Sequence, residues 1–190
     1  MRSYRAGKIL AAGFVGSIIG ATPAFAGLSA TATISSVPDG ADFDYTIQLH
    51  NTSADTPIGT FWFSWTPPDE PIEYDFLPSV PSSATGPDSW FSLISPGFPG
   101  TSIESYNYLG NNIAPGDTGT FQFTSSDSPL ALQGTSILGF PILTSFIYQG
   151  DPEVGPDAEV TPVFAVPEPS SLLLGGIGYL LIARRRRQRQ

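Results

Sequence analysis

The stretch "DFDYTIQLHN" (residues 42–51) decides the fold class, because its apolar and polar side chains alternate without a break. A two-residue period of this kind is typical of a β-strand with one buried face. The apolar face holds Phe43, Tyr45, Ile47 and Leu49. We therefore expect a half-buried strand here, with His50 on its solvent side.

The same alternation recurs further along the chain. In "GTFWFSWTPP" (59–68) it predicts Phe61, Phe63 and Trp65 on one face, with Trp62 and Ser64 on the other. No stretch of the central region has an extended helical period. Further strands are expected at 29–35, 89–94, 102–108, 119–126, 144–149 and 159–166, the last at a sheet edge because Pro162 lacks an N–H donor. The prediction is an all-β fold: a single antiparallel β-sandwich of immunoglobulin-like type with seven or eight strands.

One long segment breaks this pattern. "TPPDEPIEYDFLPSVPSSATGPDS" (66–89) is rich in proline and longer than an ordinary hairpin loop. Such a segment is either a functional surface loop or a flexible excursion.

Charge divides the chain of 190 residues into three parts. All eight basic side chains lie near the two ends, and no Lys or Arg occurs from Gly27 to Ala165. All 17 carboxylates except Glu168 lie in that central part. An anionic body repels phosphate backbones, so nucleic acid is excluded as a partner. Cysteine is absent, which excludes disulfides, thiolate metal sites and cysteine nucleophiles.

The N-terminal segment 1–26 has the three parts of a secretory signal peptide. A basic start is followed by an apolar run from Ile9 to Ile19 and then by small residues at Ala24 and Ala26. We expect the Sec translocon to export the chain, with cleavage after Ala26. The body of the protein would then comprise residues 27–165.

The C-terminal segment 166–190 combines a Pro-Glu-Pro motif, an apolar run and an arginine cluster. The run from Ser171 to Ala183 carries no charge, and as a helix it would be about 20 Å long against a hydrocarbon core of about 30 Å. Arg184–Arg187 would hold it on the cytoplasmic side. We expect one short transmembrane helix that anchors the chain transiently in the inner membrane. The anchor residues are Leu172, Leu173, Leu174, Ile177, Leu180, Leu181 and Ile182.

"VPEP" (166–169), followed by this apolar run and the arginines, resembles the PEP-CTERM sorting signal. The resemblance covers residues 166–190 only. The same tail is also called an "ice-binding protein C-terminal domain", but that label describes a sorting signal and does not imply ice binding. The resemblance implies that Pro167, Glu168 and Pro169 are recognised by exosortase, a membrane enzyme. Arg184, Arg185, Arg186 and Arg187 would form the stop-transfer cluster. The alternative is an ordinary single-pass anchor after a proline-containing linker.

The body offers little that points to catalysis or to a cofactor. His50 would have to carry any histidine chemistry alone, and no pair of carboxylates stands out for glycosidase chemistry. We expect no catalytic residue and no resident metal. Asp39, Asp42 and Asp44 are calcium candidates, because hard cations favour several oxygen ligands on loops.

Aromatic residues suggest a different kind of site. Trp62 is expected to lie opposite the Phe61 and Phe63 face, and Trp90-Phe91 adjoins the proline-rich segment. An exposed aromatic ring can stack on the apolar face of a pyranose, although both faces of a central strand can equally well be buried. The overall expectation is a non-enzymatic surface or matrix protein, associated by analogy with exopolysaccharide and biofilm. The alternatives are a carbohydrate-binding module and a calcium-stabilised adhesion domain.

Overall fold

The computed structural model describes residues 27–67, 74–150 and 155–165. The expected signal helix and the whole sorting tail lie outside these residues. Within the described ranges no helix is long and apolar enough to cross a membrane.

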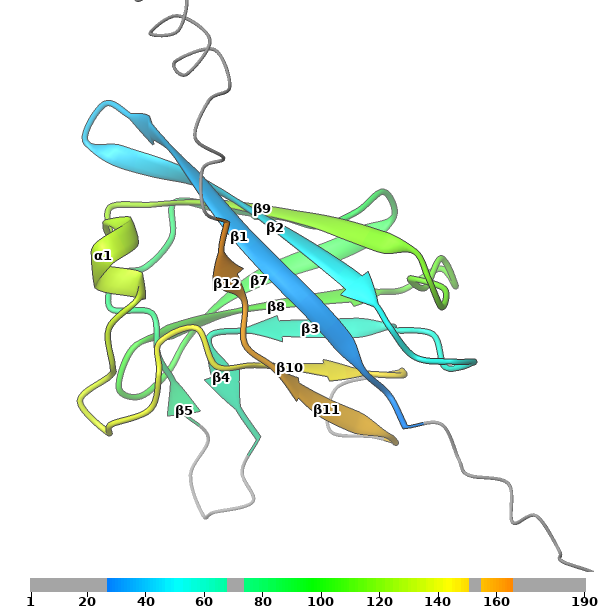
Figure 1. Ribbon diagram of the computed structural model, residues 1–190. Coiled ribbons are helices and arrows are strands. Elements are labelled where there is room, and N and C mark those ends of the chain that lie inside the picture. The colour runs from blue at the N-terminus through cyan, green and yellow to red at the C-terminus, as the bar shows by residue number, and fades with distance from the viewer. Residues whose placement is uncertain (1–26, 68–73, 151–154, 166–190) are drawn as a thin grey trace, which may run out of the picture.

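The described residues are mostly β-structure, with one helical turn (Figure 1). The strands are β1 (Ala30–Asp39), β2 (Asp42–Asn51), β3 (Thr60–Phe63), β4 (Trp65–Thr66), β5 (Tyr74–Asp75), β6 (Ser83–Thr85), β7 (Trp90–Pro96), β8 (Thr101–Asn107), β9 (Thr118–Ser125), β10 (Ser145–Tyr148), β11 (Asp157–Val160) and β12 (Val163–Phe164). The helical turn α1 (Pro129–Leu132) is capped by the Ser128 hydroxyl, which accepts a hydrogen bond from the Ala131 N–H.

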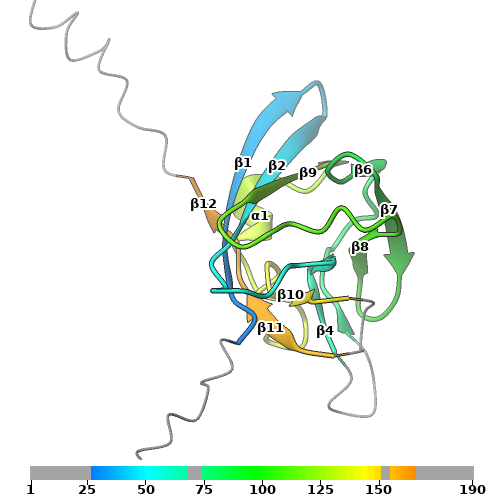
Figure 2. The same ribbon diagram turned by 90° about the vertical axis from the view of Figure 1, so that its right-hand side faces the viewer.

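Two five-stranded sheets pack face to face, which confirms the expected β-sandwich architecture. The first sheet has the order β12-β1-β2-β9-β6, and the second has the order β11-β10-β3-β8-β7. A small two-stranded sheet of β4 and β5 extends from one end. Figure 2 shows the layers along their edges, with β6 of the first sheet beside β7 of the second. The described strands outnumber the seven or eight expected, because several are only two to four residues long. The immunoglobulin-like detail stays a prediction.

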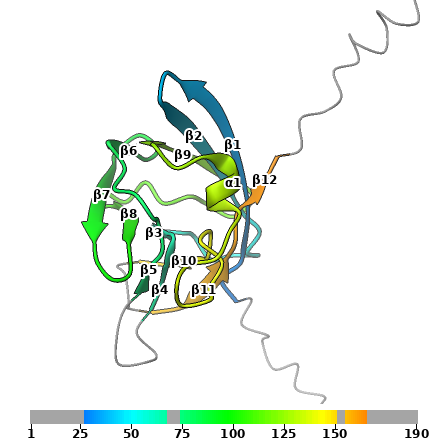
Figure 3. The same cartoon turned by 90° about the vertical axis from the view of Figure 1, so that its left-hand side faces the viewer.

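The first sheet departs from the antiparallel expectation at one pair. β12 runs parallel to β1, with Thr33 opposite Val163 and Ile34 opposite Phe164. The segment expected as one edge strand (159–166) is split at Pro162, and the chain passes there from the edge of the second sheet to the edge of the first. Since Pro162 cannot donate a ladder hydrogen bond, its position between two edge strands has a direct physical reason. Figure 3 shows β12 and α1 on the same side of the body.

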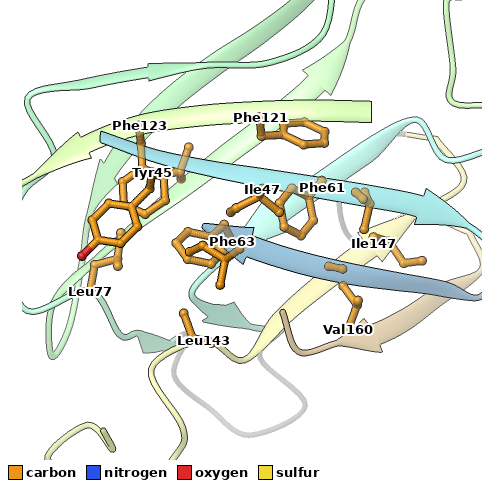
Figure 4. Packing of buried hydrophobic residues seen from close by; sticks show 14 of the residues in the cluster. Tyr45, Ile47, Phe61, Phe63, Leu77, Phe121, Phe123, Leu143, Ile147 and Val160 are labelled. Atoms are coloured by element: carbon orange, nitrogen blue, oxygen red, sulfur yellow. The ribbon is translucent and has the colours of Figure 1, made fainter. Parts of the chain in front are cut away.

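The core lies between the sheets and is rich in aromatic rings (Figure 4). Tyr45 stacks on Phe123 within the first sheet, at 4.7 Å between ring centroids. Phe61 and Phe63 of the second sheet meet Phe121 and Phe123 of the first, at 4.8 and 5.2 Å. Aromatic pairs of this kind add to the stabilisation from burying apolar area, so the two sheets hold together without disulfides.

The proline-rich segment 66–89 contributes to the core through part of its described residues, 66–67 and 74–89. Phe76 and Leu77 are buried, and Leu77 exchanges backbone hydrogen bonds with Thr101. Ser83–Thr85 forms β6 and pairs with β9. β5 and β6, the two strands of this segment's described residues after 73, are too short to show a period in sequence, so long-range pairing decides their structure.

Candidate functional site

Ser64 interrupts the alternation of the "TFWFSW" stretch and changes which way Trp65 points. Its backbone φ is +61°, in the left-handed region that non-glycine residues rarely adopt. The Ser64 hydroxyl donates to the Ile142 carbonyl, and the Ser64 N–H donates to the Ser145 hydroxyl. After this residue Trp65 lies on the same side of the sheet as Trp62, so the prediction that Trp65 shares a face with Phe61 and Phe63 is wrong.

Trp62 and Trp65 form a stacked pair on the outer side of the second sheet. Their ring centroids are 3.9 Å apart, and the ring planes differ by 5°. Trp65 is fully buried and Trp62 is only 9% exposed, with its indole N–H donating to the Ser102 hydroxyl at 2.8 Å. The expected Trp62 platform is therefore not available to a ligand, because the face of its ring is already occupied.

Trp90 is not an exposed platform either. Its ring packs edge-on against Phe121 of the core at 5.4 Å, and its N–H donates to the Asn111 carbonyl. The next residue, Phe91, is 55% exposed on the opposite side of the strand. Phe91 continues into a row of aromatic rings through Tyr106 to Tyr108, with 5.9 Å between successive centroids. We call Phe91, Tyr106 and Tyr108 the aromatic row.

A pocket of about 360 Å³ lies beside the buried tryptophan pair. This volume is at the lower end of the range of small-ligand sites. We call it the aromatic pocket. Its lining residues are Thr66, Pro67, Tyr74, Phe140, Pro141, Thr144, Phe146 and Glu159.

Packing against the body positions the three rings of the aromatic pocket. Phe146 meets Trp65 edge to face at 6.1 Å, with 88° between the ring planes. Phe140, which is 41% exposed, stacks on Phe76 at 5.4 Å and lies 6.1 Å from Tyr74. Because Phe76 and Trp65 are buried, the rings that rest on them have little freedom to move.

Among the described residues, Glu159 supplies the one carboxylate that lines the aromatic pocket. It lies directly opposite Phe146 in the antiparallel pair of β10 and β11. Side chains that face each other in this way project from the same side of a sheet, with Cβ atoms about 5 Å apart. Glu159 and Phe146 therefore present a charge and an aromatic ring together. Thr66 adds a hydroxyl group from β4, and Thr144 adds one from the residue just before β10.

The sequence did not single out Tyr74 or Phe140. Tyr74 lies in the proline-rich segment, and Phe140 follows Gly139, whose φ of +86° turns the chain. These residues come from separate segments that only the fold brings together, so no periodic signal could have found them. Glu159 is one of the 16 carboxylates between Gly27 and Ala165, and alternation along the chain does not distinguish it from the others.

Two of the polar residues singled out from sequence, His50 and Asp44, have hydrogen-bond partners. His50 is exposed as expected, and its Nδ1 atom lies 3.2 Å from the Thr118 hydroxyl. Asp39 and Asp42 face each other at the end of the β1–β2 hairpin, while Asp44 accepts a hydrogen bond from the Thr124 hydroxyl at 2.8 Å. Among the described residues, no three His, Cys, Asp or Glu side chains gather closely enough to hold a metal ion.

Asp127 is a buried carboxylate whose hydrogen bonds hold the fold. It accepts hydrogen bonds from the Ser79 N–H and hydroxyl at 2.9 and 2.7 Å, and from Ser125 at 3.3 Å. The Tyr45 hydroxyl donates to the Asp127 backbone carbonyl. Burial, with a smaller contribution from the Asp127 charge, raises the pKa of Tyr45 to about 12. These bonds join the proline-rich segment to the first sheet.

The predicted sorting residues Pro167, Glu168 and Pro169, the anchor, the arginine cluster and the signal cleavage residues Ala24 and Ala26 lie outside the described residues. The body is ordered up to their boundary, because the Ala165 N–H donates to the Ile34 carbonyl at 2.9 Å. Ala165, two residues before Pro167, is thus the last described residue and is still bonded to the sandwich.

Comparison with known proteins identifies one region. Residues 165–187 match the family model of the PEP-CTERM protein-sorting motif. This match confirms the resemblance seen in the tail and indicates an exported, exosortase-sorted protein of the cell surface or extracellular space. No curated protein matches the chain.

Proposed function

We propose that this chain is a non-enzymatic surface or matrix protein that exosortase processes and that associates with exopolysaccharide in a biofilm. The match of residues 165–187 to the sorting motif carries the first part of this proposal. The Sec translocon exports the chain and the signal peptide is removed after Ala26. The short apolar run anchors the precursor in the inner membrane until exosortase acts near Pro167–Pro169.

The physical chemistry of the tail supports a temporary anchor. An apolar run of about 20 Å is shorter than the hydrocarbon core, and arginine stems extend its effective length only modestly. The two prolines on either side of Glu168 favour an extended peptide without N–H donors at those positions. An extended segment at the membrane surface is a shape that a processing enzyme can grip.

Replacing Glu168 tests the sorting step. In Glu168→Ala we expect full-length precursor to accumulate in the membrane fraction, whereas the native protein is recovered with both ends removed. Mass spectrometry of the protein from membranes and medium measures both cleavages. The control is Asp157→Asn, which removes one exposed carboxylate from the body. Normal processing of Glu168→Ala would mean that the tail is an ordinary anchor.

The aromatic pocket supports the second part, a carbohydrate-binding role. Apolar walls with a few convergent polar groups are typical of small-ligand sites, and aromatic faces stack on the apolar faces of sugar rings. Tyr74, Phe140 and Phe146 supply the rings, and Thr66 and Thr144 supply hydroxyls that can exchange hydrogen bonds with a sugar.

A glycan titration tests this role. Because Phe146 packs against Trp65, we expect a ligand in the aromatic pocket to change the tryptophan fluorescence of the full-length protein. The signal should saturate with oligosaccharide concentration and disappear in Phe140→Ala. A fluorescence response that survives in Phe140→Ala, with the variant folded, would place binding elsewhere.

A further inference from the structure

The geometry points to one class of ligand for the aromatic pocket: a glycan that carries free, protonated amino groups. This inference rests on the proposed carbohydrate-binding role and deepens it, because it specifies the charge of the sugar. Three features of the described residues lead to it, namely the aromatic rings, the position of Glu159 and the sign of the charge on the body.

The rings of the aromatic pocket favour a cation as well as a sugar face. A positive group near the face of an aromatic ring is attracted by the electrons of that ring. Tyr74, Phe140 and Phe146 line the pocket from three separate segments, so an ammonium group inside it would meet more than one ring. A neutral hydroxyl gains much less from the same surroundings.

Glu159 adds a full negative charge beside one of these rings. It projects from the same side of the sheet as Phe146, directly across from it. An ammonium group bound here would have a carboxylate as a charge-assisted hydrogen-bond acceptor and a ring as a second partner. A uronic acid or a sulfated sugar would instead bring a second anion next to Glu159.

The charge of the whole body acts in the same direction. No Lys or Arg lies between Gly27 and Ala165, so no basic side chain of this region can neutralise an anionic polysaccharide. The summed field of its carboxylates attracts polycations and repels polyanions over distances beyond direct contact. A polymer of amino sugars is therefore the extracellular glycan with the best charge complementarity to this protein.

The aromatic pocket suits an amino sugar better than the aromatic row does. Phe91, Tyr106 and Tyr108 offer rings, but Phe91 is 55% exposed and the row brings no carboxylate to its rings in the way that Glu159 meets Phe146. The aromatic pocket combines rings, hydroxyls and a carboxylate around one volume. The aromatic row then serves as a comparison site in the experiment.

The test uses the full-length protein in detergent and three soluble probes. These are a glucosamine oligomer, its fully N-acetylated counterpart of the same length, and a uronic acid oligomer. Isothermal titration calorimetry, at a pH where the amines are protonated, measures each affinity. We expect the glucosamine oligomer to bind at least about tenfold more tightly than the N-acetylated one, and the uronic acid oligomer not to bind. Equal affinity for the first two would overturn the inference in favour of a neutral glycan.

Two matched pairs of variants locate the site. Glu159→Gln should weaken binding of the glucosamine oligomer by about tenfold, whereas Asp157→Asn, on the same strand and also exposed, should weaken it by less than about twofold. Phe140→Ala should abolish binding, and Phe91→Ala should leave it unchanged. Equal effects of the two acid variants would show diffuse attraction, and a larger effect of Phe91→Ala would move the site to the aromatic row. Either result overturns the inference.

A folding control distinguishes loss of the binding site from loss of the fold. Phe140→Tyr retains a ring that can stack on Phe76, so it should bind the glucosamine oligomer within about twofold of the native protein. Loss of binding in Phe140→Ala counts only if its far-ultraviolet circular dichroism matches that of Phe140→Tyr. The binding assay does not depend on processing, so its failure overturns the ligand class, while failure of the Glu168→Ala experiment overturns the sorting role.

Discussion

The outer face of the first sheet carries hydroxyl and amide side chains, whereas the outer face of the second sheet carries aromatic rings. On β1, β2 and β9 the exposed positions form cross-strand rows, such as Thr33, Gln48 and Thr120. The Gln48 side-chain amide donates to the Thr120 hydroxyl at 3.1 Å. On β10 and β3 the corresponding outward positions hold Phe146 and Trp62.

This difference supports placing the proposed ligand contact on the second sheet. The inward faces of both sheets are apolar and form one core. Outward polar side chains that bond to each other across strands leave little for a partner to gain. Outward aromatic rings bury further area when they meet a ligand, so affinity is expected on the second sheet. The predictions below test this comparison.

The largest effect is expected from removing Trp65. Trp65→Ala should lower the free energy of unfolding by about 3 to 5 kcal/mol, because it deletes a fully buried ring and leaves Trp62 without its stacking partner. Urea unfolding followed by far-ultraviolet circular dichroism measures the change. Thr120→Ala, on the polar face of the first sheet, is the control and should stay within about 0.5 kcal/mol of the native value. Equal costs for the two variants would remove the distinction between the two outer faces.

A smaller effect on the free energy of unfolding is expected at alkaline pH, because Tyr45 on the inward side of the first sheet then ionises. The pKa of Tyr45 is raised from 10.0 to about 12 in the folded protein. Its contribution to stability is complete below pH 10, because the tyrosine is then neutral in both states. Between pH 10 and 12 the unfolded chain ionises first, so on the order of 2 kcal/mol of stability is lost as the pH rises.

Tyr45→Phe isolates this contribution. The variant should lose about 1 kcal/mol at neutral pH, because its hydrogen bond to the Asp127 carbonyl is gone. Its unfolding free energy should then fall less steeply than that of the native protein from pH 10 upward. Parallel pH profiles for the two proteins would contradict the assignment of the slope to Tyr45.

The smallest effect is expected from calcium. Asp44 already bonds to Thr124, and Asp39 and Asp42 lie at the hairpin end of the first sheet. Millimolar calcium should therefore change the melting temperature by less than about 1 °C. Differential scanning calorimetry with calcium and then with a chelator makes the measurement. A rise of several degrees, reversed by the chelator and absent in Asp44→Asn, would establish the calcium-stabilised alternative.

The regular alternation of apolar and polar residues made the long strands predictable from sequence. The tryptophan pair beside the aromatic pocket was not predictable, because a local exception at Ser64 breaks that alternation. The strand at 42–51 is found with the expected bounds and with Tyr45, Ile47 and Leu49 buried. The same rule failed for Trp65, because Ser64 adopts a positive φ that its neighbours hold in place through hydrogen bonds. A single residue outside the extended region is enough to reverse every later side chain of a strand.

The sequence alone determined the segregation of charge, the sorting motif of the tail and the class of the fold, because each depends on residue types and spacings along the chain. Only the tertiary structure decided that Trp62 and Trp65 are buried, and that Tyr74, Phe140 and Glu159 meet around one pocket. The physical reason is that periodicity specifies which way a side chain points from its own strand. What lies opposite that side chain depends on pairing between distant segments, and local patterns carry no information about it.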